Sequence, residues 1–473
     1  MKKHDADMHF HETWDVLVIG SGFAGLAAAI EASKAGASVL VIEKMKSTGG
    51  NSRISDGGIA APNTDMQRRY GYEDSPDLFF QDMMRSGLFL NHPDLVRVVA
   101  EKAREAFEWS RDDLGVPYLD RIDIFGGHSV PRCYAAENIT GGTIINRQLE
   151  WLKRNGVEVR KETCFQEYIL DDAGAVTGAA VRPGSDVKNQ DQGAGMLLRV
   201  RRGIVLAAGG FGADVAFRVQ HDPRLGPSID TTNRASATAE ALKETLRLGA
   251  MPVHLAFIQL GPWASPDERG FGHGPMFSEY IVFQYGMIVD PATGRRFFNE
   301  LADRKRLSDA ILAKGHPCIG IADSAAVAGS GWDIGRALKN GVVRIFDTLD
   351  ELCGFYNIPG DKMRGTVDAF NRAVEAGVDT DFGKPILENA PGCKEPPFYG
   401  IRLWPKVHHV SGGAAIDMEA RVIDLDGKPI PGLFAAGEIT GGVHGACRLG
   451  SCAITECLVF GRIAGRNAAA SAT

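Results

Sequence analysis

Three glycines near the start of the chain have the spacing of a turn that binds phosphate groups. They are Gly20, Gly22 and Gly25. The first allows a tight turn, the second lets the backbone approach a pyrophosphate, and the third lets a helix pack closely on a strand. Glu43 follows after about 20 residues, where an acid accepts a hydrogen bond from a ribose hydroxyl and repels a 2′-phosphate. The pattern therefore predicts a site for a dinucleotide.

The segments around these glycines must hold the turn at the edge of a sheet. Residues 14–19 form an apolar, β-rich run before the turn, residues 26–35 indicate a helix of small side chains, and residues 38–42 indicate a second strand. This order of elements is the context that the fingerprint requires, and it places the free N–H groups of the helix start beside the phosphates. NAD and FAD both fit this first part of the chain.

The stretch directly after Glu43 favours FAD over NAD. Residues 47–52 and 56–58 are polar and rich in glycine, and we expect an extended loop there. A simple NAD-binding domain continues into another helix at this point, whereas flavoproteins run such a loop along the ribityl chain and under the isoalloxazine. Buried strands at 203–210 and 432–438 end in Ala-Gly turns, as a parallel sheet requires where a ligand crosses its carboxyl edge.

These elements predict an α/β fold, with a Rossmann-like FAD-binding domain and an inserted α+β capping domain. Residues 249–406 are richer in aromatic residues, proline and charge than the rest of the chain, and residues 359–375 indicate an isolated helix. We therefore expect the FAD-binding domain to comprise residues 1–248 and 407–473, and residues 249–406 to form the capping domain, which contributes to substrate binding.

The composition argues against several classes of partner. The 473 residues carry a net charge of −7 and no long Lys/Arg tract, so we expect no nucleic-acid partner. No run of about 18 apolar residues occurs, and residues 1–13 lack the apolar core of a signal peptide, so we expect a soluble, cytoplasmic protein with no membrane insertion. The eight cysteines match no zinc, haem-attachment or ferredoxin spacing, which predicts no metal and no second redox centre.

Further motifs, taken with the N-terminal fingerprint, are specific for one family. They are Gly-Arg-Arg-Phe-Phe-Asn-Glu at 294–300, Val-His-His-Val-Ser-Gly-Gly at 407–413, Gly-Glu-Ile-Thr-Gly-Gly-Val-His-Gly at 437–445, and Arg-Leu-Gly at 448–450. Through them nearly the whole chain resembles the fumarate reductase/succinate dehydrogenase flavoprotein family, in particular its soluble flavocytochrome c type, without a haem domain. The resemblance implies an FAD-dependent oxidoreductase acting on CH–CH bonds, in which flavin N5 transfers hydride to the C=C bond of an α,β-unsaturated carboxylate.

The resemblance also implies how FAD is bound. Residues 47–51 contain no counterpart of the histidine that carries the flavin in respiratory succinate dehydrogenases, so we expect non-covalent FAD. The implied cofactor-binding residues are Gly20, Gly22, Phe23, Ala24, Gly25, Glu43, Lys44, Gly49, Gly50, Asn51, Ser52, Gly57, Gly58, Ala208, Gly209, Gly210, Gly437, Glu438, Arg448, Ser451, Ala453 and Ile454.

The implied catalytic residues follow from the same resemblance. Arg304 takes the position of the family's proton donor, and Glu279 takes that of the relay glutamate that reprotonates it. A guanidinium is a weak acid in water, so this role requires a dry site and a neighbouring carboxylate. The family's second relay arginine falls on Val282, which leaves the proton route open. His408 and Arg448 take the positions of the carboxylate-binding residues, and the planar fork of an arginine matches a carboxylate.

The far end of the substrate position departs from the family's dicarboxylate enzymes. Gly261 and Ser278 fall where those enzymes hold a second carboxylate with a histidine and a threonine. We expect the loss of the histidine to open space, beside Met276, for a monocarboxylate enoate with a bulkier or less charged far end, of the arylacrylate or urocanate type. His128 falls beside the flavin edge, where we expect it to supply a replacement polar contact to the substrate.

Three functions remain open. The first is reduction of such a small-molecule carboxylate, with fumarate or succinate itself as a variant. The second is a dehydrogenase or desaturase of a cyclic ketone or steroid, as in the ketosteroid dehydrogenases of the same superfamily. The third is a non-catalytic, flavin-bearing electron-transfer or structural subunit. Arg304, His408 and Arg448 together favour the first. The chain has no second glycine fingerprint for NADH, so the electron donor or acceptor and the physiological direction stay unknown.

Overall fold

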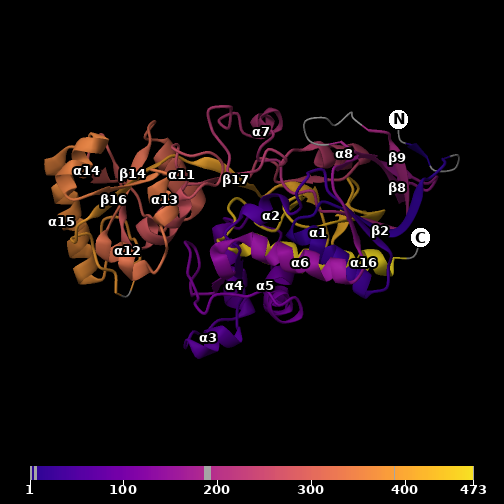
Figure 1. Ribbon diagram of the computed structural model, residues 1–473, viewed down its shortest axis with the longest axis horizontal. Coiled ribbons are helices and arrows are strands. Elements are labelled where there is room, and N and C mark those ends of the chain that lie inside the picture. Colours follow the sequence, from indigo (N-terminus) through magenta and orange to yellow (C-terminus); the bar gives the residue numbers. More distant parts are fainter. Residues whose placement is uncertain (1–2, 5–7, 186–192, 388, 472–473) are drawn as a thin grey trace. The chain divides into compact units, whose positions relative to one another are not determined.

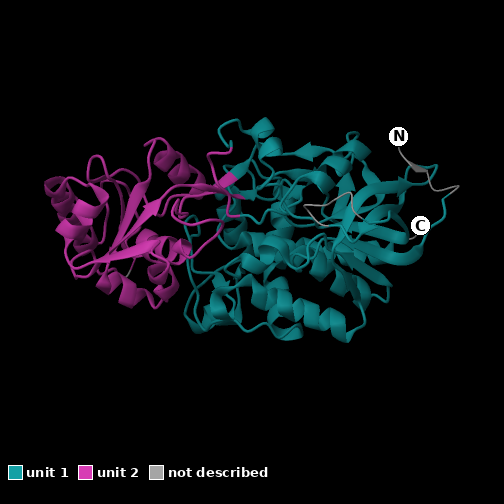
Figure 2. Ribbon diagram, turned by 45° about the horizontal axis from the view of Figure 1, so that its top comes forward, with its two compact units in different colours: residues 1–226, 233–258, 409–473 teal, residues 227–232, 259–408 magenta. Residues whose placement is uncertain are grey.

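The computed structural model describes residues 3–4, 8–185, 193–387 and 389–471 of the chain. It divides into two compact units, which have different colours in Figure 2. Unit 1 comprises residues 1–226, 233–258 and 409–473, and unit 2 comprises residues 227–232 and 259–408. The predicted limits were 248/249 and 406/407, so the inserted segment begins and ends later than predicted. Unit 2 also takes up the short segment 227–232.

Within the described residues, unit 1 is built on a nine-stranded sheet in which β2 pairs in parallel with β3 and β9, and β20 pairs in parallel with β9. The order along the sheet is β1-β7-β8-β9-β2-β3-β6, and β20 also pairs with β19. The strands are β1 (Lys3–His4), β2 (Glu12–Ile19), β3 (Val39–Ile42), β6 (Glu158–Arg160), β7 (Thr163–Leu170), β8 (Val176–Pro183), β9 (Met196–Leu206), β19 (Arg421–Ile423) and β20 (Pro429–Ala435).

The parallel strands end at one edge of this sheet. Ile19 at the end of β2 stands opposite Ile42 of β3 and Leu206 of β9, and Leu206 stands opposite Ala435 of β20. The turns that follow these strands therefore emerge next to one another, although they come from distant parts of the chain. The four strands correspond to the predicted strands at 14–19, 38–42, 203–210 and 432–438, and their prediction is confirmed.

Helices α1 (Phe23–Lys34) and α16 (Cys452–Ala470) pack against each other at very short range, and α6 (Gly141–Arg154) lies along α1 (Figure 1). A Cβ added to Gly461 of α16 would lie 2.5 Å from the carbonyl oxygen of Ala24 in α1. The third glycine of the fingerprint is equally confined, since a Cβ on Gly25 would lie 2.0 Å from the carbonyl oxygen of Gly20. Only glycine fits at these contacts.

The remaining elements of unit 1 are short or lie outside the main sheet. Two small sheets pair β4 with β5, and β18 with β10 and β21. The bounds are α2 (Gly50–Ile54), β4 (Gly58–Ala60), α3 (Asp65–Arg69), α4 (Pro76–Ser86), α5 (Pro93–Glu108), β5 (Cys133–Ala135), α7 (Val215–His221), α8 (Glu240–Leu248), β10 (Pro252–Val253), β18 (Gly413–Ala415) and β21 (Thr440–Gly441). No helix in the described part of the chain is long and apolar enough to cross a membrane.

Unit 2 has an antiparallel sheet in the order β13-β12-β14-β16-β15. Its strands are β12 (Met287–Asp290), β13 (Arg295–Arg296), β14 (Cys318–Asp323), β15 (Val343–Phe346) and β16 (Phe398–Leu403). Its helices are α9 (Gly274–Phe277), α10 (Phe283–Tyr285), α11 (Arg304–Leu312), α12 (Ser324–Ser330), α13 (Gly335–Lys339), α14 (Leu349–Tyr356) and α15 (Gly360–Ala376), and a π-helical turn spans Ser278–Val282. The helix predicted at 359–375 is therefore confirmed as α15.

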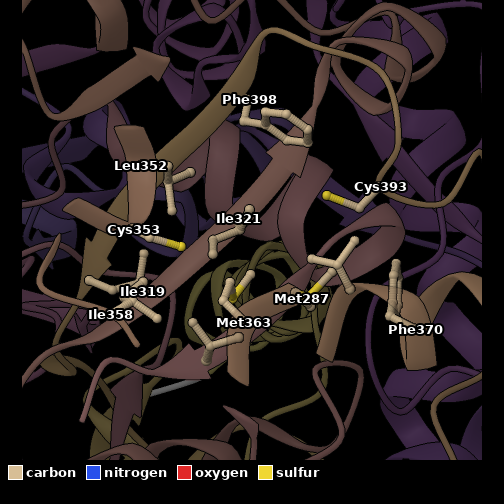
Figure 3. Packing of buried hydrophobic residues seen from close by; sticks show 12 residues of the cluster. Met287, Ile319, Ile321, Leu352, Cys353, Ile358, Met363, Phe370, Cys393 and Phe398 are labelled. Atoms are coloured by element: carbon tan, nitrogen blue, oxygen red, sulfur yellow. The ribbon is translucent and has the colours of Figure 1, made fainter. Parts of the chain in front are cut away.

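A hydrophobic core joins the sheet of unit 2 to its helices. Ile319 and Ile321 of β14 point toward Leu352 of α14 and Met363 of α15, and all four are almost completely buried (Figure 3). Unit 2 therefore has a hydrophobic core of its own, and this core can hold its side chains rigidly. The limits of the two units fall within β11 (Ile258–Gly261) and β17 (Lys406–Val410), which pair with each other.

Candidate functional site

The glycine turn of unit 1 is shaped by contacts with the neighbouring strand. Gly20 has φ +107°, a conformation that side-chain-bearing residues rarely adopt, and a Cβ there would lie 2.3 Å from the carbonyl oxygen of Ala207. Gly22 precedes α1 and would meet the hydroxyl of Ser52 at 3.1 Å if it carried a Cβ. Ser52 Oγ accepts a hydrogen bond of 3.1 Å from the N–H of Phe23. The fingerprint turn is therefore tied to the glycine-rich stretch that follows Glu43.

Ser21 links the three parts of the dinucleotide pattern. Its side chain is fully buried, and its Oγ lies 2.5 Å from Glu43 Oε2 and accepts a hydrogen bond of 2.9 Å from the N–H of Gly49. Glu43 also accepts from the N–H groups of Ser21 and Met45. A carboxylate offers about four acceptor positions, so these bonds orient Glu43 and leave capacity for a ribose hydroxyl. The sequence pattern did not single out Ser21, and its only signal was a small polar residue between two fingerprint glycines.

A pocket lies where β2, β3 and β9 end. The predicted residues Gly20, Glu43, Lys44 and Ala208 line it, and the ammonium of Lys44 donates to Thr238 Oγ1 at 2.7 Å. The sequence pattern did not predict the other lining residues, which come from the ends of β2 and β3, from β7, and from the start of α8 and the residue two before it. They are Ile19, Ile42, Thr163, Cys164, Phe165, Thr238, Glu240 and Ala241. An apolar wall with polar groups at its rim suits an adenosine, so the pocket fits this end of FAD.

The stretch after Glu43 is more structured than predicted. Gly49 has φ +99°, and residues Gly50–Ile54 form one turn of helix, which the hydrogen bond of 2.9 Å from Arg53 Nε to the carbonyl oxygen of Thr48 helps to hold. The expectation of an extended loop is wrong for this part. Asn51 hydrogen bonds to Asn233 and to the backbone N–H of Arg234. The hydrogen bonds of Asn51 and Arg53 hold this turn of helix in place, which explains why the stretch is not extended.

Polar groups from the C-terminal part of unit 1 also lie near the glycine turns. Glu438 accepts a hydrogen bond of 3.0 Å from the N–H of Val410, and burial raises the pKa of the Glu438 carboxyl to about 7. Arg448 is buried, and its Nη1 donates to the carbonyl oxygen of Leu449 at 2.8 Å. Ser411 Oγ is buried and meets no hydrogen-bond partner in the described residues, as expected where a bound group supplies the partner. Together with the pocket and the glycine turns, these groups fit FAD.

Every predicted cofactor-binding residue lies in unit 1. Gly58 is close to the start of α16, because a Cβ there would lie 2.9 Å from Ser451 Oγ. Ser451 precedes α16 with φ +60°, and Ala453 and Ile454 lie in the first turn of that helix. Residues 208–210 and Gly437 follow β9 and β20, whose ends lie together. The fold thus collects segments that are up to several hundred residues apart along the chain.

His128 does not have the role that was predicted for it. Its Nδ1 accepts from Arg132 Nη1 at 3.1 Å, since an arginine can only donate, and its Nε2 therefore donates to the carbonyl oxygen of Gly450 at 2.9 Å. Both ring nitrogens are engaged within unit 1, so the expected polar contact to substrate is wrong. Instead, His128 anchors the turn that carries Arg448.

Arg132 connects His128 to a buried pair of acids. Its guanidinium is fully buried and binds Asp74 at 2.8 Å through both Nε and Nη2, and Asp82 at 2.5 Å through Nη1. Burial alone would raise the pKa of Asp82, but hydrogen bonds from Arg132 and Ser129 lower it overall. Asp82 and Arg132 therefore stay charged at neutral pH, and the network Asp74–Arg132–Asp82 holds His128 against the Arg448 turn.

Unit 2 brings Arg304 and Glu279 together as predicted. Arg304 is the first residue of α11, whose start is capped by Asp303, and its Nη2 forms an ion pair with Glu279 Oε1. The two side chains are only 15% and 10% exposed. Val282 lies in the same π-helical turn as Glu279 and is fully buried. The pair therefore has the low exposure that a guanidinium needs in order to act as an acid.

The motif at 294–300 has a structural role in placing Arg304. Arg296 binds Glu300 with two hydrogen bonds of 2.9 and 2.7 Å, and it binds Asp379 at 2.9 Å. Glu300 is almost completely buried and also accepts from the N–H of Ile288 in β12. The segment that leads into α11 is thus fixed to the sheet of unit 2, because these buried charges cannot separate without losing their partners.

His408 is held by a threonine and an indole. Its Nδ1 lies 2.9 Å from Thr232 Oγ1, and its ring meets the ring of Trp263 edge-on, with a centroid distance of 4.8 Å. The same indole lies 5.9 Å from the guanidinium carbon of Arg304. Trp263 therefore contacts two of the predicted catalytic residues, and the sequence pattern missed it because no motif marks it.

The remaining predicted substrate residues do not behave as expected. Ser278 is fully buried, and its Oγ lies 2.6 Å from the carbonyl oxygen of Trp263 and 3.0 Å from that of Gly274, so its proton is used within unit 2. Gly261 opens no space, since a Cβ there would lie 2.8 Å from the ring of Trp263. That prediction is wrong because a bulky neighbour fills the volume that the glycine leaves. Met276 is half-buried in α9.

Matches to known proteins cover nearly the whole chain. The family model described as FAD binding domain matches residues 15–454. The acrylate reductase flavoprotein subunit of Shewanella woodyi is 42% identical over 464 residues, which cover 96% of this chain and 91% of the relative. The open conformation of a flavocytochrome c3 fumarate reductase matches with a TM-score of 0.77 and 32% identity, covering 97% of this chain and 78% of that one.

A solved steroid enzyme shares the fold at a lower level of identity. The 3-ketosteroid-Δ4-(5α)-dehydrogenase of Rhodococcus jostii RHA1 matches with a TM-score of 0.78 and 23% identity, covering 99% of this chain and 100% of that one. The glycine turns, the pocket at the sheet edge and the match over nearly the whole chain have one common explanation. The chain belongs to the FAD-binding oxidoreductase family of the fumarate reductase flavoproteins, whose members act on carbon–carbon double bonds.

Proposed function

We propose that this chain is an FAD-dependent reductase of α,β-unsaturated monocarboxylates. The observation that carries the proposal is the ion pair of Arg304 and Glu279, which lies beside the indole that also packs on His408. A sheltered guanidinium with a carboxylate at its tip is what protonation of a substrate carbon requires. The name of the Shewanella woodyi relative, an acrylate reductase subunit, supports the same class of substrate.

Each candidate residue has a separate role in adding two hydrogens across a C=C bond. Bound FAD, once an external electron donor has reduced it, would supply the hydride from N5. Arg304 donates the proton that the other carbon takes up, and Glu279 returns a proton to Arg304. The groups suited to a substrate carboxylate are the planar fork of Arg448 in unit 1 and the ring of His408 in unit 2, which Thr232 holds through Nδ1. One hydride and one proton convert the double bond into a CH–CH bond, so atoms and charge balance.

The proton route differs from the one that the family resemblance implies. Val282 stands at the second relay position, and a buried valine cannot carry a proton. Glu279 keeps 10% of its side-chain exposure, so we assign its reprotonation to water.

A steroid or cyclic-ketone dehydrogenase is the alternative. The Rhodococcus jostii enzyme is 23% identical to this chain, and at this level the similarity shows only that the two proteins share a fold. The presence of both Arg448 and His408 favours an enoate, because a ketone substrate has no carboxylate for these residues to bind.

Fumarate is expected to be a poor substrate. Gly261 has no side chain, and the hydroxyl proton of Ser278 is used by backbone carbonyl groups, so neither offers a cation to a second carboxylate. Burying a carboxylate without a partner costs several kcal/mol. The bound flavin is reduced anaerobically and mixed with acrylate, fumarate or a 3-ketosteroid, and the rate of flavin reoxidation is followed by absorbance. We expect kcat/KM for acrylate to exceed that for fumarate by about tenfold or more.

The same experiment separates the alternatives. A preference for fumarate of tenfold or more would contradict the monocarboxylate assignment. Reoxidation by the ketosteroid alone would establish the alternative function instead.

The flavin is expected to be bound without a covalent bond. The stretch Ser47–Asn51 contains no histidine, and its contacts run to Arg53 and Asn233 within unit 1. Acid or heat should therefore release all the flavin from the holoenzyme. The absorbance of the supernatant after acid precipitation measures this, and yellow colour that stays with the precipitated polypeptide would disprove it.

A further inference from the structure

We infer that Trp263 sets the size limit of the substrate, an inference that rests on the proposed function. Its indole closes the volume next to the catalytic residues of unit 2, so the enzyme accepts short enoates with a hydrogen or a small group at the β carbon. This reverses the expectation of an aryl or imidazole far end.

The first step is the position of the indole. Its ring centroid lies 4.8 Å from that of His408, which we assign to the substrate carboxylate, and 5.9 Å from the guanidinium carbon of Arg304, which we assign to the proton. A substrate that reaches both residues therefore lies close to this ring. Because Trp263 is 1% exposed, the ring packs behind the two residues and limits the space beside them.

The second step is the volume that the indole fills. A Cβ on Gly261 would lie 2.8 Å from Cζ2, 3.0 Å from Cε2 and 3.0 Å from Cη2 of Trp263. The six-membered ring therefore presses directly on the backbone of β11. No side chain fits at residue 261 while the indole is in place, and the glycine is explained by the indole and not by a large substrate.

The third step is how firmly the indole is held. Trp263 is 1% exposed, and its carbonyl oxygen accepts a hydrogen bond of 2.6 Å from the buried Ser278 Oγ. The ring of Phe271 packs against it with a centroid distance of 5.2 Å. Protein interiors are close-packed, so forcing a buried aromatic ring out of its place costs about 1–3 kcal/mol or more. The ring cannot move aside for a phenyl or imidazole group without that penalty.

The chemical consequence is selection by length. Acrylate needs no space beyond its terminal CH₂, whereas cinnamate must place a phenyl ring where the indole stands. The indole thus replaces the charged residue of a dicarboxylate enzyme with an apolar wall, which excludes both a second carboxylate and a bulky group.

The test compares Trp263→Ala with the unmodified holoenzyme on acrylate and cinnamate. We expect the unmodified enzyme to favour acrylate in kcat/KM by about a hundredfold or more, and Trp263→Ala to raise the cinnamate-to-acrylate ratio by about tenfold or more. Trp263→Phe retains a ring and loses no hydrogen bond, because the indole N–H meets no acceptor in the described residues, so this variant should keep most of the discrimination.

Trp332→Ala is the matched control. It removes another buried indole of unit 2, which is 6% exposed and packs on Tyr280 with a centroid distance of 4.5 Å. It should lower the unfolding temperature without changing the substrate ratio. Equal turnover of cinnamate and acrylate by the unmodified enzyme, or a ratio that Trp263→Ala leaves unchanged, would overturn the inference.

A double variant tests the contact between residue 261 and the Trp263 ring directly. It also shows whether a loss of activity in a single variant comes from that contact or from failure to fold. Gly261→His alone should clash with the indole and lose activity, whereas Gly261→His combined with Trp263→Ala should recover acrylate reduction and gain on fumarate. A double variant that is no more active than Gly261→His alone would contradict the contact. If no enoate reoxidises the flavin in any variant that binds FAD, the proposed function fails, and that result differs from a wrong size limit.

Discussion

Replacing Arg304 by lysine is expected to lower kcat/KM for acrylate by about 10²–10⁴-fold while FAD stays bound. Lysine keeps the charge but loses the planar fork that contacts Glu279, so the proton is no longer held at the same place. The residues that fit FAD all lie in unit 1, so the flavin content should not change. Steady-state rates and the ratio of flavin to protein absorbance measure the two effects separately.

Arg306→Lys is the matched control for this prediction. Arg306 lies two residues further along α11, is 67% exposed and pairs with Asp303, so its replacement should change the rate less than about twofold. Retention of more than a tenth of the rate by Arg304→Lys would correspond to less than about 1.4 kcal/mol in the barrier. That loss is too small for the proton donor, and the assignment of Arg304 would then be abandoned.

Replacing Arg132 by methionine is expected to lower the free energy of unfolding of unit 1 by about 3–5 kcal/mol. The substitution removes the buried guanidinium from Asp74 and Asp82, and both carboxylates are fully buried. It also removes the donor to His128 Nδ1, so the turn that carries Arg448 loses its anchor. Urea titrations followed by circular dichroism and by flavin fluorescence measure the loss.

Arg85→Met tests whether burial is the cause. Arg85 pairs with the same Asp82 at 3.1 Å, but its side chain is 61% exposed. An exposed ion pair contributes about 0–1 kcal/mol, so this variant should be nearly as stable as the unmodified protein. Equal losses for Arg85→Met and Arg132→Met would show that the buried network does not stabilise unit 1.

Acid should act on the same network. The pKa of Asp82 is lowered in the folded state, so its contribution to stability is present above the ordinary value of 3.8 and is lost as the pH falls below it. The stability difference between the unmodified protein and Arg132→Met should therefore shrink in acid.

Local patterns were enough to predict the sheet edge that fits FAD. Gly20, Gly22 and Gly25 follow a strand and open a helix, and this unit needs only its own residues to form a phosphate-binding turn. The helix at 359–375 was equally predictable, because its periodicity is carried by neighbouring residues.

Other features depend on how side chains pack in the folded chain. His128 was expected to contact substrate, but Arg132 and the Gly450 turn engage both of its nitrogens. Gly261 was expected to open space, but Trp263, two residues later, folds its ring back onto it. A sequence shows that a position lacks a side chain, as at Gly261. Only the packed structure shows which neighbouring side chain occupies the volume beside it.

The sequence by itself determined the cofactor class and the α/β fold, because short motifs with fixed spacing encode them. Through the family resemblance it also predicted Arg304, Glu279, His408 and Arg448 as candidate catalytic residues. The tertiary structure decided which of the neighbouring residues are available to a substrate. Hydrogen bonds and volume are shared among residues that meet only after folding, so Ser278 is used by a carbonyl group and the space beside Gly261 is filled by an indole. We therefore expect the substrate size limit to depend on the packed interior of unit 2, which no local motif encodes.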